Sequence, residues 1–167
     1  MKKTFLSLFL LIYTIQYNAQ RAETNFNNNW NFILEDNPSF SKETFDTKGW
    51  KSLNVPHDWS FEKGVRKDGD QGQGGGYHDG GIGWYRKQFN VNKESLSKIT
   101  YINFDGVYMN SEVWVNGNHL GKRPYGYISF RYNISKYLKE GKNTIAVRVD
   151  NSLEPSARWY HPCGIYA

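Results

Sequence analysis

Carboxylates are the side chains in this sequence best suited to acid–base chemistry, in which one group donates a proton and another accepts it. Five stand at candidate positions: Asp58, Asp105, Glu112, Asp150 and Glu154. Catalysis by a carboxylate pair needs two groups that face one substrate bond, and no spacing among these five places two of them face to face. Aspartates in turns commonly cap backbone N–H groups instead. We therefore expect turn-capping or surface carboxylates, and no catalytic residue in this chain.

The sequence supports metal ligation and nucleophilic catalysis no better than it supports catalysis by a carboxylate pair. The four histidines, His57, His78, His119 and His161, lack the close pairing of ligands that is typical of a metal site. Cys163 is the only cysteine, and no neighbouring base would activate its thiol. The pattern predicts no metal site and no cofactor, and a Cys163 thiol that is buried or lies at an interface.

The first 20 residues are typical of a secretory signal peptide. Lys2 and Lys3 precede a mostly apolar stretch, residues 5–15, that is too short to span a bilayer. Cleavage is expected after Ala19 or Gln20, and the alternative of a buried N-terminal helix fits the two lysines poorly. We expect an exported protein, in the periplasm or outside the cell, with no membrane partner.

The remainder, residues 21–167, has the size of one domain. The whole sequence has a formal net charge of +5, and its lysines and arginines never run together for more than two residues. A surface that tracks phosphates needs a denser basic cluster, so nucleic acid is not expected as a partner. Aromatic residues make up 17% of the chain, which suits both packing between two sheets and stacking on sugar rings.

Short stretches of alternating apolar and polar residues, separated by turn signals, predict an all-β fold. Asn116-Gly117 is typical of a two-residue hairpin, because both positions of a type I′ turn need positive φ. No predicted helix is long enough to cross between parallel strands, so the sheets are expected to be antiparallel, in a jelly-roll β-sandwich. The predicted strands are residues 29–34, 51–55, 83–91, 98–104, 111–115, 119–123, 129–134 and 143–150, with one helical turn within 135–140.

The two-residue period of a strand assigns side chains to its two faces. Ile145, Val147 and Val149 share one face of the last predicted strand, opposite Arg148 and Asp150. Contacts in the core or between domains are expected at Ile102, Phe104, Trp114, Phe130, Ile145 and Val147.

Five segments carry a joint signature: residues 55–59 (VPHDW), 80–89 (GGIGWYRKQF), 104–121, 147–151 (VRVDN) and 158–167 (RWYHPCGIYA). In this order they resemble the N-terminal sugar-binding domain of family 2 glycoside hydrolases, the β-galactosidase group. The resemblance implies a sandwich of the galactose-binding-domain type and an enzyme that acts on terminal β-galactosides.

The same resemblance implies how the chain is divided. A signal peptide over residues 1–20 would precede a sugar-binding sandwich over residues 21–167 that is truncated at its C-terminal end. Members of the family carry their two catalytic glutamates on a (β/α)8 barrel that follows the sandwich and an immunoglobulin-like domain. The expected partners are therefore a carbohydrate and these two missing domains, and we expect no hydrolysis by this chain alone.

The resemblance also implies which residues approach the sugar: Asp58, Asn151, Arg158 and Trp159. The chemistry is consistent, since carboxylates and amides bind vicinal hydroxyls, arginine spans two oxygens and tryptophan covers an apolar sugar face. For Trp59 and Trp159 the alternative is packing against the barrel. The family's sodium-binding carboxylate is replaced by Ala157, so a sodium site is not carried over.

Residues 64–81 are the irregular stretch, with seven glycines between residues 69 and 81 among Asp68, Asp70 and Asp79. The segment is expected to lie outside the sheets. It is either a mobile surface loop or a loop at the rim of a sugar pocket, where glycine lets backbone approach a ligand.

Two other functions fit a jelly roll: a free-standing carbohydrate-binding module, and an adhesion domain without affinity for sugar. The second explains the family segments poorly. If further domains dock on this one, an exposed apolar patch is expected, with Trp59, Trp159, Tyr160 and Ile165 as its candidates.

Overall fold

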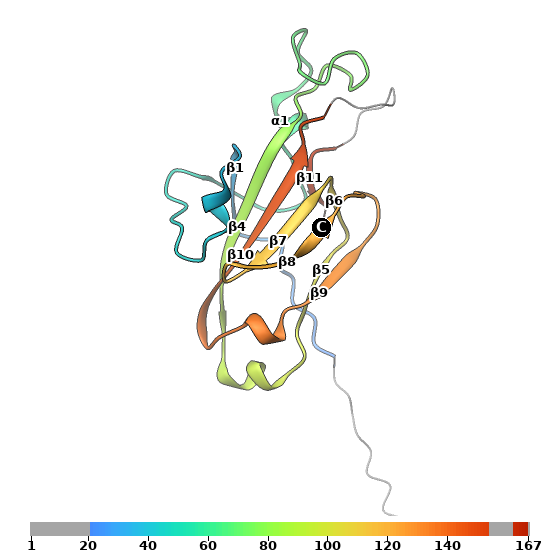
Figure 1. Ribbon diagram of the computed structural model, residues 1–167. Coiled ribbons are helices and arrows are strands. Elements are labelled where there is room, and N and C mark those ends of the chain that lie inside the picture. Colours follow the sequence, from blue (N-terminus) through green and yellow to red (C-terminus); the bar gives the residue numbers. More distant parts are fainter. Residues whose placement is uncertain (1–20, 154–161, 167) are drawn as a thin grey trace, which may run out of the picture.

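The computed structural model describes residues 21–153 and 162–166 (Figure 1). The predicted signal peptide lies outside these ranges, as do Arg158 and Trp159. Within them the chain is almost entirely β-structure, and every strand pairing is antiparallel. The predicted all-β class is confirmed. No helix in the described ranges is long and apolar enough to cross a membrane.

One layer of the sandwich is a six-stranded sheet in the order β2-β1-β4-β10-β7-β8. Its centre is the pairing of β4 with β10, which runs from Gly81↔Asn151 to Val91↔Gly141. The strands are β1 (Trp30–Leu34), β2 (Lys51–Leu53), β4 (Gly81–Val91), β7 (Ser111–Val115), β8 (Asn118–Arg123) and β10 (Gly141–Asn151). Predicted strands correspond to all six, with ends that differ by a few residues.

The other layer consists of two small sheets. The three-stranded sheet has the order β3-β11-β6, and the two-stranded sheet pairs β5 with β9. The strands are β3 (His57–Asp58), β5 (Tyr101–Phe104), β6 (Gly106–Tyr108), β9 (Phe130–Asn133) and β11 (Gly164–Tyr166). The sequence predicts β5 and β9, but it does not predict the three-stranded sheet.

The main core lies between these layers. Ile145, Val147 and Val149 of β10 point into it, as their two-residue period predicts, and meet Ile102 and Phe104 of β5. Of the six predicted contacts, five belong to this core. Trp114 is the exception, because it lies on the outer face of the large sheet, where its ring stacks on Trp84 at 5.1 Å in a second, smaller cluster.

Turns set the register of these strands. The β7–β8 hairpin closes at Asn116 and Gly117, whose φ angles are 48° and 77°, as the type I′ prediction requires. In residues 21–153 and 162–166, helical structure is limited to α1 (Trp59–Lys63) and three short 3-10 turns: η1 (Pro38–Ser41), η2 (Lys93–Ser97) and η3 (Ser135–Tyr137). The last of these lies in the predicted helical turn.

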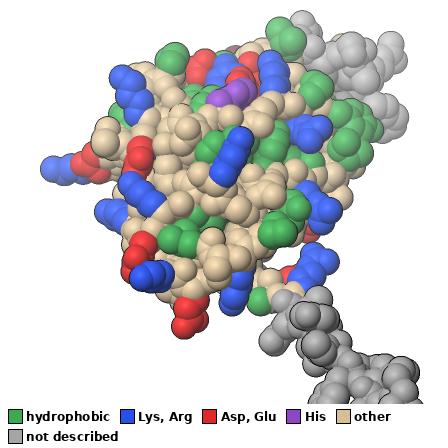
Figure 2. Space-filling model, turned by 60° about the horizontal axis from the view of Figure 1, so that its bottom comes forward, with side chains coloured by type: hydrophobic (Ala, Val, Ile, Leu, Met, Phe, Trp, Pro, Cys, Tyr) green, Lys and Arg blue, Asp and Glu red, His purple; other side chains and the backbone are tan. Residues whose placement is uncertain are grey.

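Charged side chains are dispersed over the surface. On the face shown in Figure 2, lysines and arginines stand singly or beside acidic residues, with small groups of apolar side chains between them. Such a mixture of signs is typical of a soluble domain.

Candidate functional site

Segments far apart in the sequence meet at one end of the sandwich, where α1 and the glycine-rich loop lie in Figure 1. β3 leads directly into α1, β11 pairs with β3 through Gly164↔Asp58, and β10 ends nearby at Asn151. This end of the domain contains both described residues among the four predicted to approach sugar. It is the candidate site.

Asp58 holds the start of α1. Its Oδ1 accepts hydrogen bonds from the backbone N–H groups of Ser60 and Phe61, at 3.0 and 3.2 Å, and from the Ser60 hydroxyl at 2.8 Å. The same oxygen accepts from the Cys163 N–H at 3.1 Å. Aspartate is a favoured N-cap because its carboxylate satisfies donors that lack a partner in the helix. Asp58 therefore also ties the helix to the residue before β11.

Asn151 ends β10 with its side chain turned inward. It is 7% exposed, and its Nδ2 donates to Cys163 Sγ at 2.7 Å. The prediction that Cys163 is a buried or interface thiol is confirmed, since Cys163 is 1% exposed. Burial raises the pKa of the Cys163 thiol to about 11, so the group is neutral and a poor nucleophile at physiological pH.

The glycine-rich loop lies outside the sheets, as predicted, and buried polar anchors hold it against the site. Gln71 Nε2 donates to the carbonyl oxygen of Asn151 at 3.2 Å, and Trp59 Nε1 donates to that of Gly80 at 2.9 Å. Asp79 accepts from Lys63 and Arg66, at 3.1 and 2.9 Å. Burial alone would raise the pKa of Asp79, but these two cations outweigh it and hold the pKa below its usual value.

A second polar cluster at this end consists of His57, Tyr85 and Glu62. His57 Nδ1 is 2.7 Å from the Tyr85 hydroxyl, and its Nε2 is 3.2 Å from Glu62 Oε2, a contact that falls short of hydrogen-bond geometry. Glu62 also forms an ion pair with Lys51 at 2.6 Å. Burial lowers the pKa of His57, against the opposing influence of Glu62. In the neutral tautomer with its proton on Nε2, Nδ1 accepts from the Tyr85 hydroxyl and the Nε2 proton faces the Glu62 carboxylate.

The structure thus brings together two of the four predicted sugar contacts, Asp58 and Asn151, on either side of Cys163. Arg158 and Trp159 lie outside the described residues, between Leu153 and Pro162. Trp59 is 1% exposed and its ring stacks on Phe32 at 5.8 Å, so it packs in the core of this domain.

The predicted apolar docking patch is wrong for the two candidates that the structure describes. Trp59 and Ile165 are 1% and 2% exposed, because both lie in the main core. Trp159 and Tyr160 lie outside the described residues. The apolar side chains that are exposed around α1 and the glycine-rich loop are instead Phe61, Val65 and Tyr77, at 75%, 67% and 41%.

Of the five candidate carboxylates, Asp58, Glu112 and Asp150 cap backbone N–H groups or pair with a cation, Asp105 is exposed, and Glu154 lies outside the described residues. Arg148 on the outer face of the large sheet contacts Asp36, Glu112 and Asp150 at 2.9, 3.6 and 3.3 Å. Asp150 also caps a turn by accepting from Ser152 N at 3.1 Å. These roles agree with the sequence prediction of surface or turn-capping carboxylates. Within the described ranges, no group of three or more metal-ligating side chains is found.

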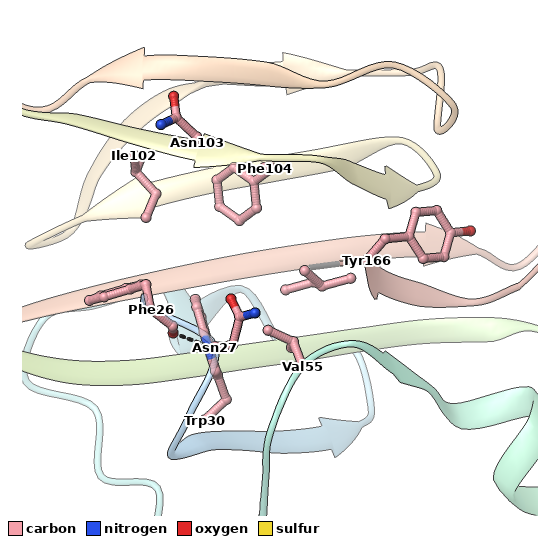
Figure 3. Close-up of a pocket in the computed structure, with 9 residues that line it drawn as sticks. Phe26, Asn27, Trp30, Val55, Ile102, Asn103, Phe104 and Tyr166 are labelled. Carbon is pink, nitrogen blue, oxygen red and sulfur yellow. Dashed lines mark hydrogen bonds between the residues drawn. The ribbon is translucent and has the colours of Figure 1, made fainter. Parts of the chain in front are cut away.

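A small cavity lies away from this end, between the layers (Figure 3). Its volume is about 30 Å³, room for a water molecule or two and far too little for a sugar. Phe26, whose carbonyl oxygen accepts from Trp30 Nε1 at 2.9 Å, closes one side, and Ile102 and Phe104 close the other. The cavity lies beside Phe26 and Asn27, which precede β1.

Sequence reasoning missed Glu62, Tyr85 and Gln71 as members of this end, and it found no partner for His57. A local signal for α1 was present: an N-cap aspartate at Asp58 and a glycine with positive φ at Gly64 bracket a helix of one turn. No local signal pairs His57 with Tyr85, because their contact is made between strands of different sheets.

Comparison with known families gives one match, to the family described as "Glycosyl hydrolases family 2, sugar binding domain", over residues 24–165. Among curated relatives, a putative beta-glucuronidase of Formosa agariphila is 78% identical over 162 residues, which are 96% of this chain and 16% of the relative. The beta-galactosidase BoGH2A of Bacteroides ovatus is 50% identical over 149 residues, or 89% of this chain and 18% of the relative.

Solved structures give the same picture. The crystal structure of a beta-glycosidase from Bacteroides vulgatus superimposes with a TM-score of 0.81 at 47% identity, covering 86% of this chain and 19% of that one. The chain therefore spans less than a fifth of the length of these relatives.

Proposed function

The chain belongs to glycoside hydrolase family 2 as its N-terminal sugar-binding domain, and from this premise we propose that the whole protein is an exported enzyme that hydrolyses terminal β-glycosides. In this proposal the domain lends one side of the sugar site, and the catalytic glutamates lie on a downstream barrel. The convergence of Asp58 and Asn151 on Cys163 carries it, because Asn151 and Cys163 flank in sequence the segment that contains Arg158 and Trp159. The sequence places no two carboxylates face to face, so the chain alone is expected to be inactive.

The proposed substrate is a β-galactoside, in agreement with the name of the 50% identical relative. A β-glucuronide is the second candidate, because the 78% identical relative is named a putative beta-glucuronidase. The two sugars differ in a neutral hydroxymethyl group against a carboxylate. A glucuronide would need a cation near that carboxylate, since an unpaired buried charge is costly.

The proposed roles of the rim residues follow from their chemistry. Arg158 spans two sugar oxygens, Trp159 covers an apolar face, and Asp58 and Asn151 approach hydroxyls. Two of these roles are constrained by geometry: Asp58 Oδ1 already accepts four hydrogen bonds, and the Asn151 amide already donates to Cys163. Any sugar contact by these two comes in addition to a structural role. Arg158 is therefore the sharper probe.

The test is kinetic and uses the longer protein encoded by the open reading frame that contains this chain. We expect it to release nitrophenol from an aryl β-galactoside, whereas the 167-residue chain releases none. Arg158→Ala should lower kcat/KM roughly ten- to hundredfold, because a charged hydrogen bond is worth about 1.5 to 3 kcal/mol. The Tm should not change.

Arg131→Ala is the matched control, because Arg131 is exposed on β9. Asn151→Ala should lower both kcat/KM and Tm, since it removes the buried amide that donates to Cys163 Sγ. A lower Tm for Arg158→Ala with an unchanged kcat/KM would show that Arg158 is structural. Faster turnover of the aryl β-glucuronide would favour the second candidate. Turnover by the purified 167-residue chain would overturn the proposal that the catalytic residues lie on a downstream barrel.

A further inference from the structure

Exposed aromatic side chains gather on the loop between β8 and β9. Tyr125, Tyr127 and Ile128 are 56%, 51% and 52% exposed, although each is large and apolar. The Tyr127 ring lies 5.8 Å from that of Tyr125 and rests 5.1 Å from that of Tyr108 in β6, which is buried at 8% exposure. We call the exposed side chains Tyr125, Tyr127 and Ile128 the tyrosine patch. Contiguous exposed apolar groups of this kind usually mark a binding surface.

The loop that carries the patch is held close to the sheet. Its first residue, Pro124, accepts a backbone hydrogen bond from Asn110 at 3.2 Å. Gly126 lies so near β6 that a Cβ at this position would be 2.4 Å from Tyr108 Cδ2. Any other residue would push the loop outward, so the glycine fixes the positions of Tyr125 and Tyr127 on either side of it. A surface ordered in advance loses little entropy when it binds.

The shape and charge of the patch favour a protein partner over a sugar. The ring pairs are tilted at 55° and 68°, which gives an uneven surface, whereas a sugar face stacks on a flat, open ring. The loop sequence Pro124-Tyr-Gly-Tyr-Ile-Ser129 has no charged residue. Tyrosines at the centre of an uncharged area are typical of the core of a protein interface.

The patch also borders the last described strand. Tyr166 of β11 pairs with Gly106 of β6, and a Cβ on Gly106 would lie 2.6 Å from the Tyr166 ring and 3.0 Å from the carbonyl oxygen of Gly126. The end of β11 and the loop of the patch thus meet at one glycine. This chain spans 16 to 19% of the relatives, so a polypeptide that continues from β11 in a longer protein would begin beside the patch.

We propose that the tyrosine patch is the surface on which the polypeptide following Ala167 docks in the longer protein, with Tyr125 and Tyr127 inserted into an apolar surface of that downstream part. The inference rests on the proposed function, which requires such a downstream part, and goes beyond it by naming the contact surface.

The test compares the labelling of tyrosine side chains by hydroxyl radicals in two proteins, the 167-residue chain and the longer protein, with mass spectrometry as the readout. Tyr125 and Tyr127 should be labelled about tenfold more slowly in the longer protein, because interface burial removes most of their contact with water. Tyr101 is the internal control: it is 44% exposed, lies on β5 at the end away from β6, and should be labelled equally in both.

A variant tests the energetics of the same contact. The double change Tyr125→Ser and Tyr127→Ser should lower the Tm of the longer protein and leave that of the 167-residue chain unchanged, whereas Tyr101→Ser should affect both alike. Equal labelling in a longer protein that does hydrolyse glycosides would overturn this inference alone. Protection of the patch by added galactose or glucuronic acid in the 167-residue chain would overturn it in favour of a sugar platform. A reading frame that stops after Ala167 would overturn both this inference and the proposed function.

Discussion

His57 is held in the folded domain in a setting that suits only its neutral form. It is 7% exposed, faces the Tyr85 hydroxyl and packs its ring at 4.6 Å from that of Phe32. Burial lowers its pKa from the ordinary value of 6.5. The unfolded chain therefore binds a proton at His57 at a higher pH than the folded chain does. The stability that this group contributes is complete above about pH 6.5 and is lost as the pH falls toward the depressed folded pKa.

The unfolding free energy should consequently decrease between pH 7.5 and pH 5.5, by at most about 1.4 kcal/mol per pH unit for one proton. His57→Gln should reduce this slope, because glutamine does not titrate. Urea unfolding at several pH values measures it, with His119→Gln as the control, since the His119 side chain is 45% exposed. If the slope survives in His57→Gln and disappears in His119→Gln, the pH dependence of the unfolding free energy comes from His119 and the prediction is wrong.

At the scale of residues, the sequence predicts the roles of residues that act on their own neighbours in the chain. The turn at Asn116-Gly117 follows from backbone sterics, and the capping tendency of Asp58 follows from its side chain. It did not reach the contact of His57 with Tyr85, which are 28 residues apart in sequence. Such contacts depend on how two sheets face each other, which short-range pattern does not encode.

Among the elements, the short strand β11 holds the three-stranded sheet together. With only Gly164, Ile165 and Tyr166, it is the middle strand that joins β3 to β6. At Gly164 φ is +142°, and a Cβ would lie 2.1 Å from the His57 carbonyl oxygen and 2.5 Å from the Tyr85 hydroxyl. The glycine is needed for both reasons, since other residues rarely adopt this φ and there is no space for a side chain.

Gly164→Ala should therefore lower the unfolding free energy by about 2 to 5 kcal/mol, from backbone strain and forced repacking together. Gly49→Ala is the matched control, because its φ is +87° and nothing lies within 4 Å of its Cβ. The control should cost only the strain of a positive φ, about 1 to 2 kcal/mol. Urea denaturation measures both, and equal losses would show that the close approach at Gly164 is without consequence.

Element length helps to explain which strands the sequence predicts, although it also predicts β2, which has three residues. β4 and β10 each extend over 11 residues, long enough for the two-residue period to be read. β3 and β11 have two and three residues, too few for a period of their own. Their pairing partners, not their own sequences, make them strands.

For the molecule as a whole, the reaction rate of the single thiol, Cys163, measures how often the folded domain opens. Cys163 is 1% exposed and its pKa is raised to about 11, so neither access nor ionisation favours reaction. A thiol reagent should modify it about a thousandfold more slowly than an unprotected cysteine, or slower still, which corresponds to an opening free energy of about 4 kcal/mol or more. Absorbance of the released thiolate at pH 8 gives the rate.

The matched control is Ser97→Cys in a Cys163→Ala background, because Ser97 is exposed. It should react at the rate of a free thiol. If Cys163 reacts at that same rate without denaturant, the segment before β11 opens locally, and the buried arrangement at the candidate site does not persist in solution.

The pairing of Ile165 with His57 also limits when this part of the protein can fold during synthesis. More than 100 residues separate these partners, and a ribosome adds roughly 5 to 20 residues per second. β3 is thus synthesised some seconds before the strand that pairs with it, and the three-stranded sheet β3-β11-β6 cannot form until β11 has emerged. For the exported protein we propose, this end of the domain therefore completes its fold only after residue 166 has been made, however early the other sheets form.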